Sequence, residues 1–169
     1  MKNFFISVFI VLFLPIKSFG LIEVDITRGN LNPLPIAVSA LSIDETSRKS
    51  FEKILKKKNI GIEISIIVEN NLKTSGLFNP LNKDAFLQAP DIANLKPRFE
   101  DWNLIKAQAL VTGKVTNIDG KLRVEFRLWD VLAGKEMMAL AFTTVPDNWR
   151  RVGHIITDKV YQRLTGEKG

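Results

Sequence analysis

The sequence contains no cysteine and only one histidine, His154, among its 169 residues. Without cysteine the fold holds no disulfide, even in an oxidising compartment, and a cysteine-linked lipid anchor is excluded. Thiol catalysis and zinc sites built from cysteine and histidine are excluded for the same reason. These absences remove several common classes of exported protein from consideration.

Motifs for catalysis, phosphate or calcium are also missing. The ten glycines are scattered singly, so no Gly-rich phosphate or dinucleotide loop is present. Residues 117–120 resemble part of a calcium loop but lack the acidic ligands that should follow, and we expect a turn. Arg150, His154 and Asp158 are spaced for an i,i+4 ion-pair ladder on one helix face, and no serine has the context of a nucleophile elbow. We therefore predict structural roles for Trp149, Arg150, His154 and Asp158, no cofactor, no metal, and no enzymatic activity.

No apolar run is long enough to span a membrane. The run Phe4 to Leu14 is interrupted only by Ser7, and it is about half of the ~20 residues that a spanning helix needs. Lys2 precedes it and the small residue Gly20 follows, which is the pattern of a secretory signal peptide. We predict a signal peptide at residues 1–20 that is cleaved between Gly20 and Leu21.

The charge of the chain gives little support to a nucleic-acid partner. Removing residues 1–20 takes away two lysines and no acid, which lowers the formal net charge from +6 to +4. A modest positive charge spread along an exported chain is weak evidence for nucleic-acid binding. We expect a soluble exported protein with no nucleic-acid partner, although a nucleic-acid module would follow if the signal peptide were misidentified.

The first stretch after the predicted cleavage site alternates apolar and polar residues from Ile22 to Thr27, which is typical of a half-buried strand. Arg28-Gly29-Asn30, Pro33 and Pro35 then separate it from the rest. We predict a mobile strand over residues 21–33. Such a strand either pairs with its own sheet or is lent to a partner.

The next residues predict a strand followed by two helices. Residues 34–41 are short and apolar, as in a buried strand. Residues 42–59 predict a helix with Asp44 as N-cap and lysines at its end. Residues 60–75 alternate like a strand but also form a helical stripe, and their length and Gly76 favour a helix. Residues 82–100 predict loops, with a single turn near residues 84–87.

The last third predicts an antiparallel meander and a covering helix. Residues 109–118, 121–129 and 136–145 read as strands, with a two-residue turn at Asp119-Gly120. Asp147 is the predicted N-cap of the final helix. Its apolar stripe consists of Trp149, Val152, Ile156, Val160 and Leu164. The predicted fold class is α/β of the α+β type: a mixed sheet of about five strands with helices on one face, over residues 34–165.

Several short motifs occur together in a fixed order. They are SGLFNPL at 75–81, FEDW at 99–102, ALVTG at 109–113, VEFRLWDV at 124–131, NWRRVGH at 148–154 and LTGEKG at 164–169. Together with the post-signal strand, they make the chain similar to the N-terminal region of the TolB family, the periplasmic components of the Tol–Pal system. The resemblance implies an α/β domain followed by a six-bladed β-propeller, which is absent here. Residues 166–169 would begin the linker to that propeller.

The resemblance also implies a function and partners. Members of the family are non-enzymatic periplasmic adaptors that support outer-membrane integrity and constriction at division. Their mature N-terminal segment binds the C-terminal domain of TolA, and their propeller carries the main site for the lipoprotein Pal, so that they associate with membranes only through partners. The positions that match the TolA-binding segment are Leu21, Ile22, Glu23, Val24, Asp25, Ile26, Thr27, Arg28 and Gly29.

Two features depart from the family pattern: the propeller is missing after Gly169, and the lysine-rich residues 44–58 form a longer piece than expected between the second strand and the following helix. An alternative function is an exported α/β domain that binds or hydrolyses a small envelope ligand in a pocket near the last helix, with Arg150, His154 and Asp158 as its polar groups.

Overall fold

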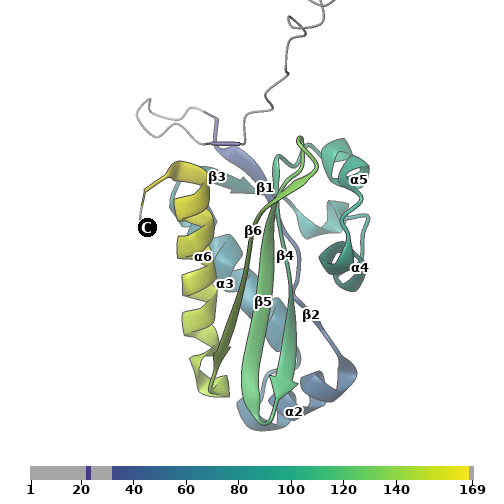
Figure 1. Ribbon diagram of the computed structural model, residues 1–169, viewed down its shortest axis with the longest axis vertical. Coiled ribbons are helices and arrows are strands. Elements are labelled where there is room, and N and C mark those ends of the chain that lie inside the picture. The colour runs from purple at the N-terminus through teal and green to yellow at the C-terminus, as the bar shows by residue number, and fades with distance from the viewer. Residues whose placement is uncertain (1–21, 24–31, 168–169) are drawn as a thin grey trace, which may run out of the picture.

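The structure, a computed structural model, describes residues 22–23 and 32–167 (Figure 1). Its centre is one mixed sheet with the strand order β3-β1-β4-β5-β6, in which the short β2 also pairs with β4. The strands are β1 Leu34–Val38, β2 Ser42–Ile43, β3 Phe78–Pro80, β4 Ala109–Ile118, β5 Lys121–Asp130 and β6 Lys135–Thr144. β1 runs parallel to β3 and β4, and β4, β5 and β6 form the antiparallel meander. The predicted fold class is thereby confirmed.

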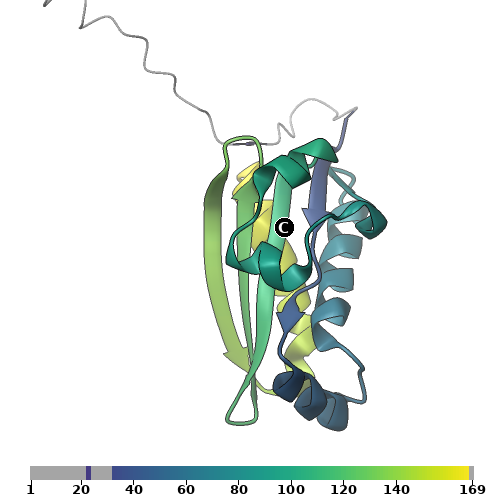
Figure 2. The same cartoon turned by 90° about the vertical axis from the view of Figure 1, so that its right-hand side faces the viewer.

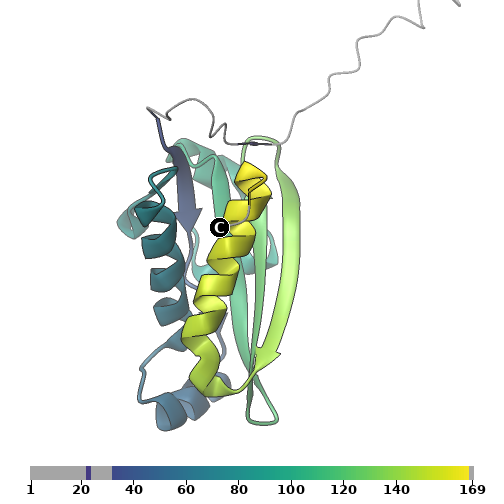
Figure 3. The ribbon, with the colours of Figure 1, turned by 90° about the vertical axis from the view of Figure 1, so that its left-hand side faces the viewer.

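The two long helices share one face of the sheet. α3 (Ile60–Thr74) and α6 (Trp149–Thr165) pack against each other there, as Figure 3 shows, and α2 (Glu45–Leu55) lies at the end of the sheet. Every second side chain of a strand points to the same face of the sheet. Ile36 and Val38 of β1 therefore point to the helices and form part of the core between sheet and helices. The predicted stripe of α6 is confirmed: Trp149, Val152, Ile156, Val160 and Leu164 are all buried in this core.

A smaller layer covers part of the other face, so the helices lie on both faces of the sheet and not on one face as predicted. The helices α4 (Pro90–Leu95) and α5 (Phe99–Leu104) lie over β1 and β4 (Figure 2). Trp102 packs there with Ala37 and Leu110, whose side chains point away from α3 and α6. The prediction of loops over residues 82–100 is wrong for α4 and for the first two residues of α5, because each helix has six residues and is too short to show a helical period.

The choice of a helix over residues 60–75 is correct. Asn59 caps α3, and its side chain accepts hydrogen bonds from the backbone N–H groups of Gly61 and Ile62. The competing strand pattern arose because Ile62 and Ile66 lie on the exposed side of the helix, with 43% and 41% of their surface accessible. Asp44 caps α2 as predicted and accepts from the backbone N–H of Ser47 at 2.9 Å.

The start of the last helix differs from the prediction. Residues Pro146–Asn148 form a 3₁₀ turn, and α6 begins at Trp149. Asp147 is therefore not the N-cap, and Asn148, which occupies that position, directs its side chain to Thr144 Oγ1 at 2.9 Å. The helix ends as predicted, because Gly166 adopts the left-handed conformation with φ of 78°.

The lysine-rich residues 44–58 form α2 and the short connection that follows it. α2 ends at Leu55, and Lys56 adopts a left-handed conformation with φ of 56°. Lys57 lies 3.4 Å from the carboxylate of Glu63 and over the ring of Trp149, so it links this segment to α3 and α6. None of the helices in the described part of the chain combines the length and apolar character that crossing a bilayer requires.

Candidate functional site

The predicted partner-binding segment enters the described structure at Ile22 and Glu23, whereas Gly20, Leu21 and residues 24–29 lie outside it. The backbone N–H of Ile22 donates a hydrogen bond to Asp130 Oδ2 at 3.2 Å. Its side chain is half-buried and packs against the main hydrophobic core, while Glu23 is exposed. The first described residue of the segment is thus attached to the domain by one backbone hydrogen bond and one apolar side chain.

Asp130 is the last residue of β5 and is almost fully buried, with 1% of its surface accessible. Its second oxygen, Oδ1, accepts the backbone N–H of Ala133 at 2.8 Å and so holds the turn between β5 and β6. Gly134 completes this turn with φ of 62°, a conformation that glycine adopts without strain. Asp130 therefore has one oxygen committed to its own turn and one directed at the incoming chain.

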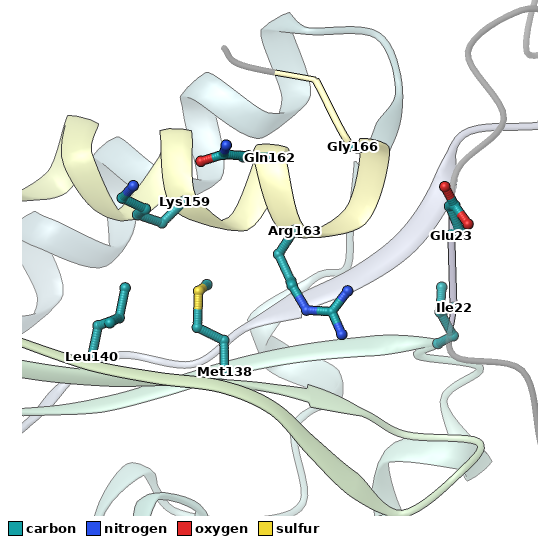
Figure 4. A pocket seen from close by; sticks show the side chains of 8 residues that line it. All are labelled: Ile22, Glu23, Met138, Leu140, Lys159, Gln162, Arg163 and Gly166. Atoms are coloured by element: carbon teal, nitrogen blue, oxygen red, sulfur yellow. The ribbon is translucent and has the colours of Figure 1, made fainter.

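A groove extends from Ile22 between α6 and β6 and has a volume of about 700 Å³ (Figure 4). Met138 and Leu140 rise into it from β6, and Lys159 and Arg163 come from α6. The remaining lining residues are Ile22, Glu23, Gln162 and Gly166. An apolar floor with two cations on one wall suits an extended segment that alternates apolar and acidic side chains.

The seam between α6 and β6 is hollow at its other end as well. A second cavity of about 330 Å³ is lined by Phe142 and Thr144 of β6 and by Arg151 and Ile155 of α6, among others. β6 is a ten-residue edge strand of the sheet, and its residues from Met138 to Thr144 line the two cavities, apart from Ala139. Long edge strands are templates for the addition of another strand. The described surface therefore offers both a groove and an edge to an extended chain.

Trp149, Arg150 and His154, which were predicted to be structural, make separate contacts within α6 and between α6 and α3. Trp149 is buried, and the guanidinium of Arg150 lies over its ring at 4.3 Å. His154 Nδ1 lies 2.8 Å from Asn71 Nδ2, and because an amide nitrogen only donates, Nδ1 is the acceptor. This bond ties α6 to α3.

The ion-pair ladder that the spacing permitted is not formed. Within residues 22–23 and 32–167, no ion pair joins Arg150, His154 and Asp158 to one another. None of the three lines either of the two cavities described along α6, so the polar groups of the alternative ligand-binding function do not meet in these cavities. The described residues also contain no group of three or more side chains that could hold a metal ion.

Asp130 is the site residue that sequence reasoning missed. The alternation of β5 places Leu122, Val124, Phe126 and Leu128 inward, and continuing it by two residues places Asp130 inward as well. A carboxylate at a position reserved for core side chains is a signal of a specific polar partner, because burying an unpaired charge is costly. The signal was therefore present in the sequence.

Comparisons with known proteins agree with the motifs. The profile of the TolB amino-terminal domain matches residues 22–137. A curated relative, the Tol-Pal system protein TolB of Pelagibacter ubique, is 82% identical over 156 residues, which cover 92% of this chain but only 35% of the relative, so the chain spans about a third of that protein. The crystal structure of TolB from Acinetobacter baumannii has a TM-score of 0.62 at 22% identity and covers 82% of this chain and 30% of that one, which shows a shared fold. The chain belongs to the TolB amino-terminal domain family.

Proposed function

We propose that this chain is the N-terminal part of a periplasmic, non-enzymatic adaptor of the Tol–Pal system. Its mature N-terminal segment, Leu21 to Gly29, binds the C-terminal domain of TolA. Through that contact it supports outer-membrane integrity and constriction at division. Membership of the TolB amino-terminal domain family supports a role in the Tol–Pal system. The few contacts that hold Ile22 to the domain support a partner-binding role for the segment.

The attachment of Ile22 is the observation that carries this proposal. Among the described contacts, one backbone hydrogen bond at 3.2 Å and one half-buried side chain hold the start of the segment. A single hydrogen bond contributes about 1 kcal/mol. A partner that offers a row of backbone hydrogen bonds and pockets for alternate side chains can therefore displace this attachment by strand addition. Ile22, Val24 and Ile26 would supply the apolar face of the added strand.

The proposed binding of Pal concerns the part of the longer relatives that this chain does not cover. The curated relative is about three times as long as the segment matched here. We propose that Pal binds mainly to a propeller in that remaining part, and that it alters how often the N-terminal segment is released. Such a change is a population shift between packed and free states.

Binding of purified TolA C-terminal domain tests the proposal directly. Deleting residues 21–32 is expected to abolish binding in isothermal titration calorimetry, and unchanged affinity would end the assignment. A matched pair of double variants then separates the two faces of the segment. Ile22→Ser with Ile26→Ser should weaken binding by at least about tenfold, equivalent to ~1.4 kcal/mol. Glu23→Ser with Thr27→Ser alters the same number of residues on the other face and should weaken it much less.

Processing and export are tested separately. N-terminal sequencing of the protein recovered from the periplasm should give Leu21 as the first residue. Recovery with Met1 at its start would contradict the predicted signal peptide.

A further inference from the structure

Positive charge is concentrated at the end of the sheet that lies opposite to Ile22 and Gly166 (Figure 1). At this end α2 contacts both β4 and the 3₁₀ turn before α6. The end is formed by residues 44–63, 117–121 and 145–151. These residues contain nine lysines and arginines and six acids, so three of the four net positive charges of residues 21–169 lie here.

The indole ring of Trp149 brings cations from two distant elements together. Lys57 Nζ lies 5.9 Å from the centre of this ring, and the guanidinium of Arg150 lies 4.3 Å from it. Lys57 also pairs with the carboxylate of Glu63 at 3.4 Å. Neighbouring like charges repel each other, and the dipole of α6 disfavours cations such as Arg150 in its first turn. The fold therefore gathers these cations at a cost in stability, which an anionic partner would offset.

Exposed aliphatic side chains lie at the same end as the cations. Ile54, in the last turn of α2, has 49% of its surface accessible, and Ile118 and Val145 are exposed as well. The two aromatic residues of this end, Phe51 and Trp149, are buried, so they do not form the stacking platform that single-stranded nucleic acids use. Cations together with exposed aliphatic side chains are typical of a surface that lies on a bilayer.

We propose that this basic end docks on a bilayer that contains anionic phospholipids. The basic end consists of Lys53, Lys56, Lys57, Lys58, Arg150 and Arg151. Its cations contact the lipid phosphate groups, and Ile54 enters the headgroup layer. The connections at Ile22 and Gly166 lie at the opposite end, so the docked domain keeps both of them away from the bilayer. The contact involves lipid and not TolA, so this proposal and the proposed function fail independently.

Co-sedimentation with vesicles tests the contact. The protein that begins at Leu21 is used, because the apolar run within residues 1–20 would bind bilayers by itself. Vesicles of phosphatidylcholine and phosphatidylglycerol at about 7:3 should bind it, and vesicles of phosphatidylcholine alone should not. Each cation at an anionic surface strengthens binding about fivefold. Three exposed cations of the basic end are therefore neutralised together, and binding should weaken at least about tenfold: Lys53→Gln, Lys58→Gln and Arg151→Gln.

A matched triple variant removes the same charge from exposed positions outside the basic end: Lys73→Gln, Lys96→Gln and Lys135→Gln. Its binding to the mixed vesicles should stay within about twofold of the wild-type value. Equal weakening by the two triple variants would overturn the proposal, because net charge alone would then explain the binding. Equal binding to vesicles with and without phosphatidylglycerol would overturn it as well.

A second pair of variants tests the apolar part of the contact. Ile54→Ser should weaken binding to the mixed vesicles severalfold, whereas Ile92→Ser, at an equally exposed position of α4, should not. Unchanged binding in Ile54→Ser would contradict entry of this side chain into the headgroup layer. A wild-type protein that binds a single-stranded DNA oligonucleotide but not the mixed vesicles would identify nucleic acid as the partner of the basic end and overturn the proposal.

Discussion

Gln88 shows how a single side chain fixes a layer of this domain. Its Oε1 accepts hydrogen bonds from the indole N–H of Trp102 at 2.7 Å and from the backbone N–H of Arg98 at 2.8 Å. Both bonds connect the loop before α4 to the start of α5. Trp102, the largest buried side chain of this cluster, is therefore oriented by one amide oxygen.

Replacing Gln88 should destabilise the domain. Gln88→Ala leaves the buried indole N–H of Trp102 without an acceptor, and an unsatisfied buried donor costs about 1–3 kcal/mol. We expect a loss of about 2 kcal/mol in the free energy of unfolding, measured by urea denaturation with tryptophan fluorescence. Asn103→Ala, at an exposed position of α5, should change stability by less than about 0.5 kcal/mol. Equal effects of the two variants would contradict the assigned role.

The cap at Asp44 makes a pH-dependent contribution. Hydrogen bonds from the backbone N–H and the hydroxyl of Ser47 lower the pKa of Asp44 from its ordinary value of 3.8. Because the pKa is lower in the folded state, the stabilisation is present above pH 3.8 and is lost as the pH falls through the folded-state pKa.

Asp44→Ala should therefore destabilise the protein in a way that depends on pH. We expect a loss of about 1 kcal/mol at pH 7, as for other N-cap residues, and a smaller loss near pH 3. Urea denaturation of both proteins at the two pH values measures the difference. A loss that grows as the pH falls would contradict the sign derived from the pKa of Asp44.

At the scale of elements, β4 is held between two neighbours at very close range. A Cβ built on Gly113 would lie 2.4 Å from the backbone oxygen of Glu125 and 2.6 Å from Leu41 Cδ2. The oxygen of Glu125 is a backbone atom of β5, so rotation of a side chain cannot relieve this clash. Gly113 therefore sets how closely the two central strands approach.

Gly113→Ala should force β4 and β5 apart. Overpacking of a core commonly costs about 1–3 kcal/mol, and we expect the upper part of this range because a backbone atom is in the way. Thermal unfolding followed by circular dichroism measures it. Thr116→Ala, at another position of β4, is the control and should not produce this loss of stability. A Gly113→Ala variant as stable as the wild-type protein would contradict the close approach of β4 and β5.

Long regular elements were predictable from the sequence, and short ones were not. β4, predicted at residues 109–118, has the bounds Ala109–Ile118, because ten residues display the two-residue period clearly. α4 and α5 give no such period over six residues. Their positions depend instead on the Trp102–Gln88 contact, which joins residues 14 apart in the chain. Asp147 is not the N-cap because it lies within the 3₁₀ turn Pro146–Asn148 that precedes α6.

The candidate site was predictable only in part. Alternation identified the segment that begins at Ile22, but its attachment depends on Asp130, which is 108 residues away in the sequence. Local sequence patterns carry no information about a contact between residues that far apart. The family, by contrast, was predictable, because ordered motifs such as FEDW and VEFRLWDV extend along the chain and the family profile matches residues 22–137.

At the scale of the whole molecule, docking of the N-terminal segment and binding of TolA should compete. If the segment must leave the groove, a variant that weakens docking increases the fraction of molecules ready to bind. Asp130→Asn is then expected to raise the apparent affinity for the TolA C-terminal domain severalfold in calorimetry. Asp158→Asn should not change it, and a lower affinity for Asp130→Asn would show that the docked form is the one that binds.

Ile22 and Gly166 border the same groove, although 144 positions separate them in the chain. Both connections of the domain, to whatever precedes Ile22 and to whatever follows Gly166, are therefore made at one end of the sheet. In a longer protein of this family, a second domain attached behind Gly166 would stand next to the N-terminal segment. It could obstruct or free that segment by its position alone, and the sheet and helices between the two connections could remain rigid throughout.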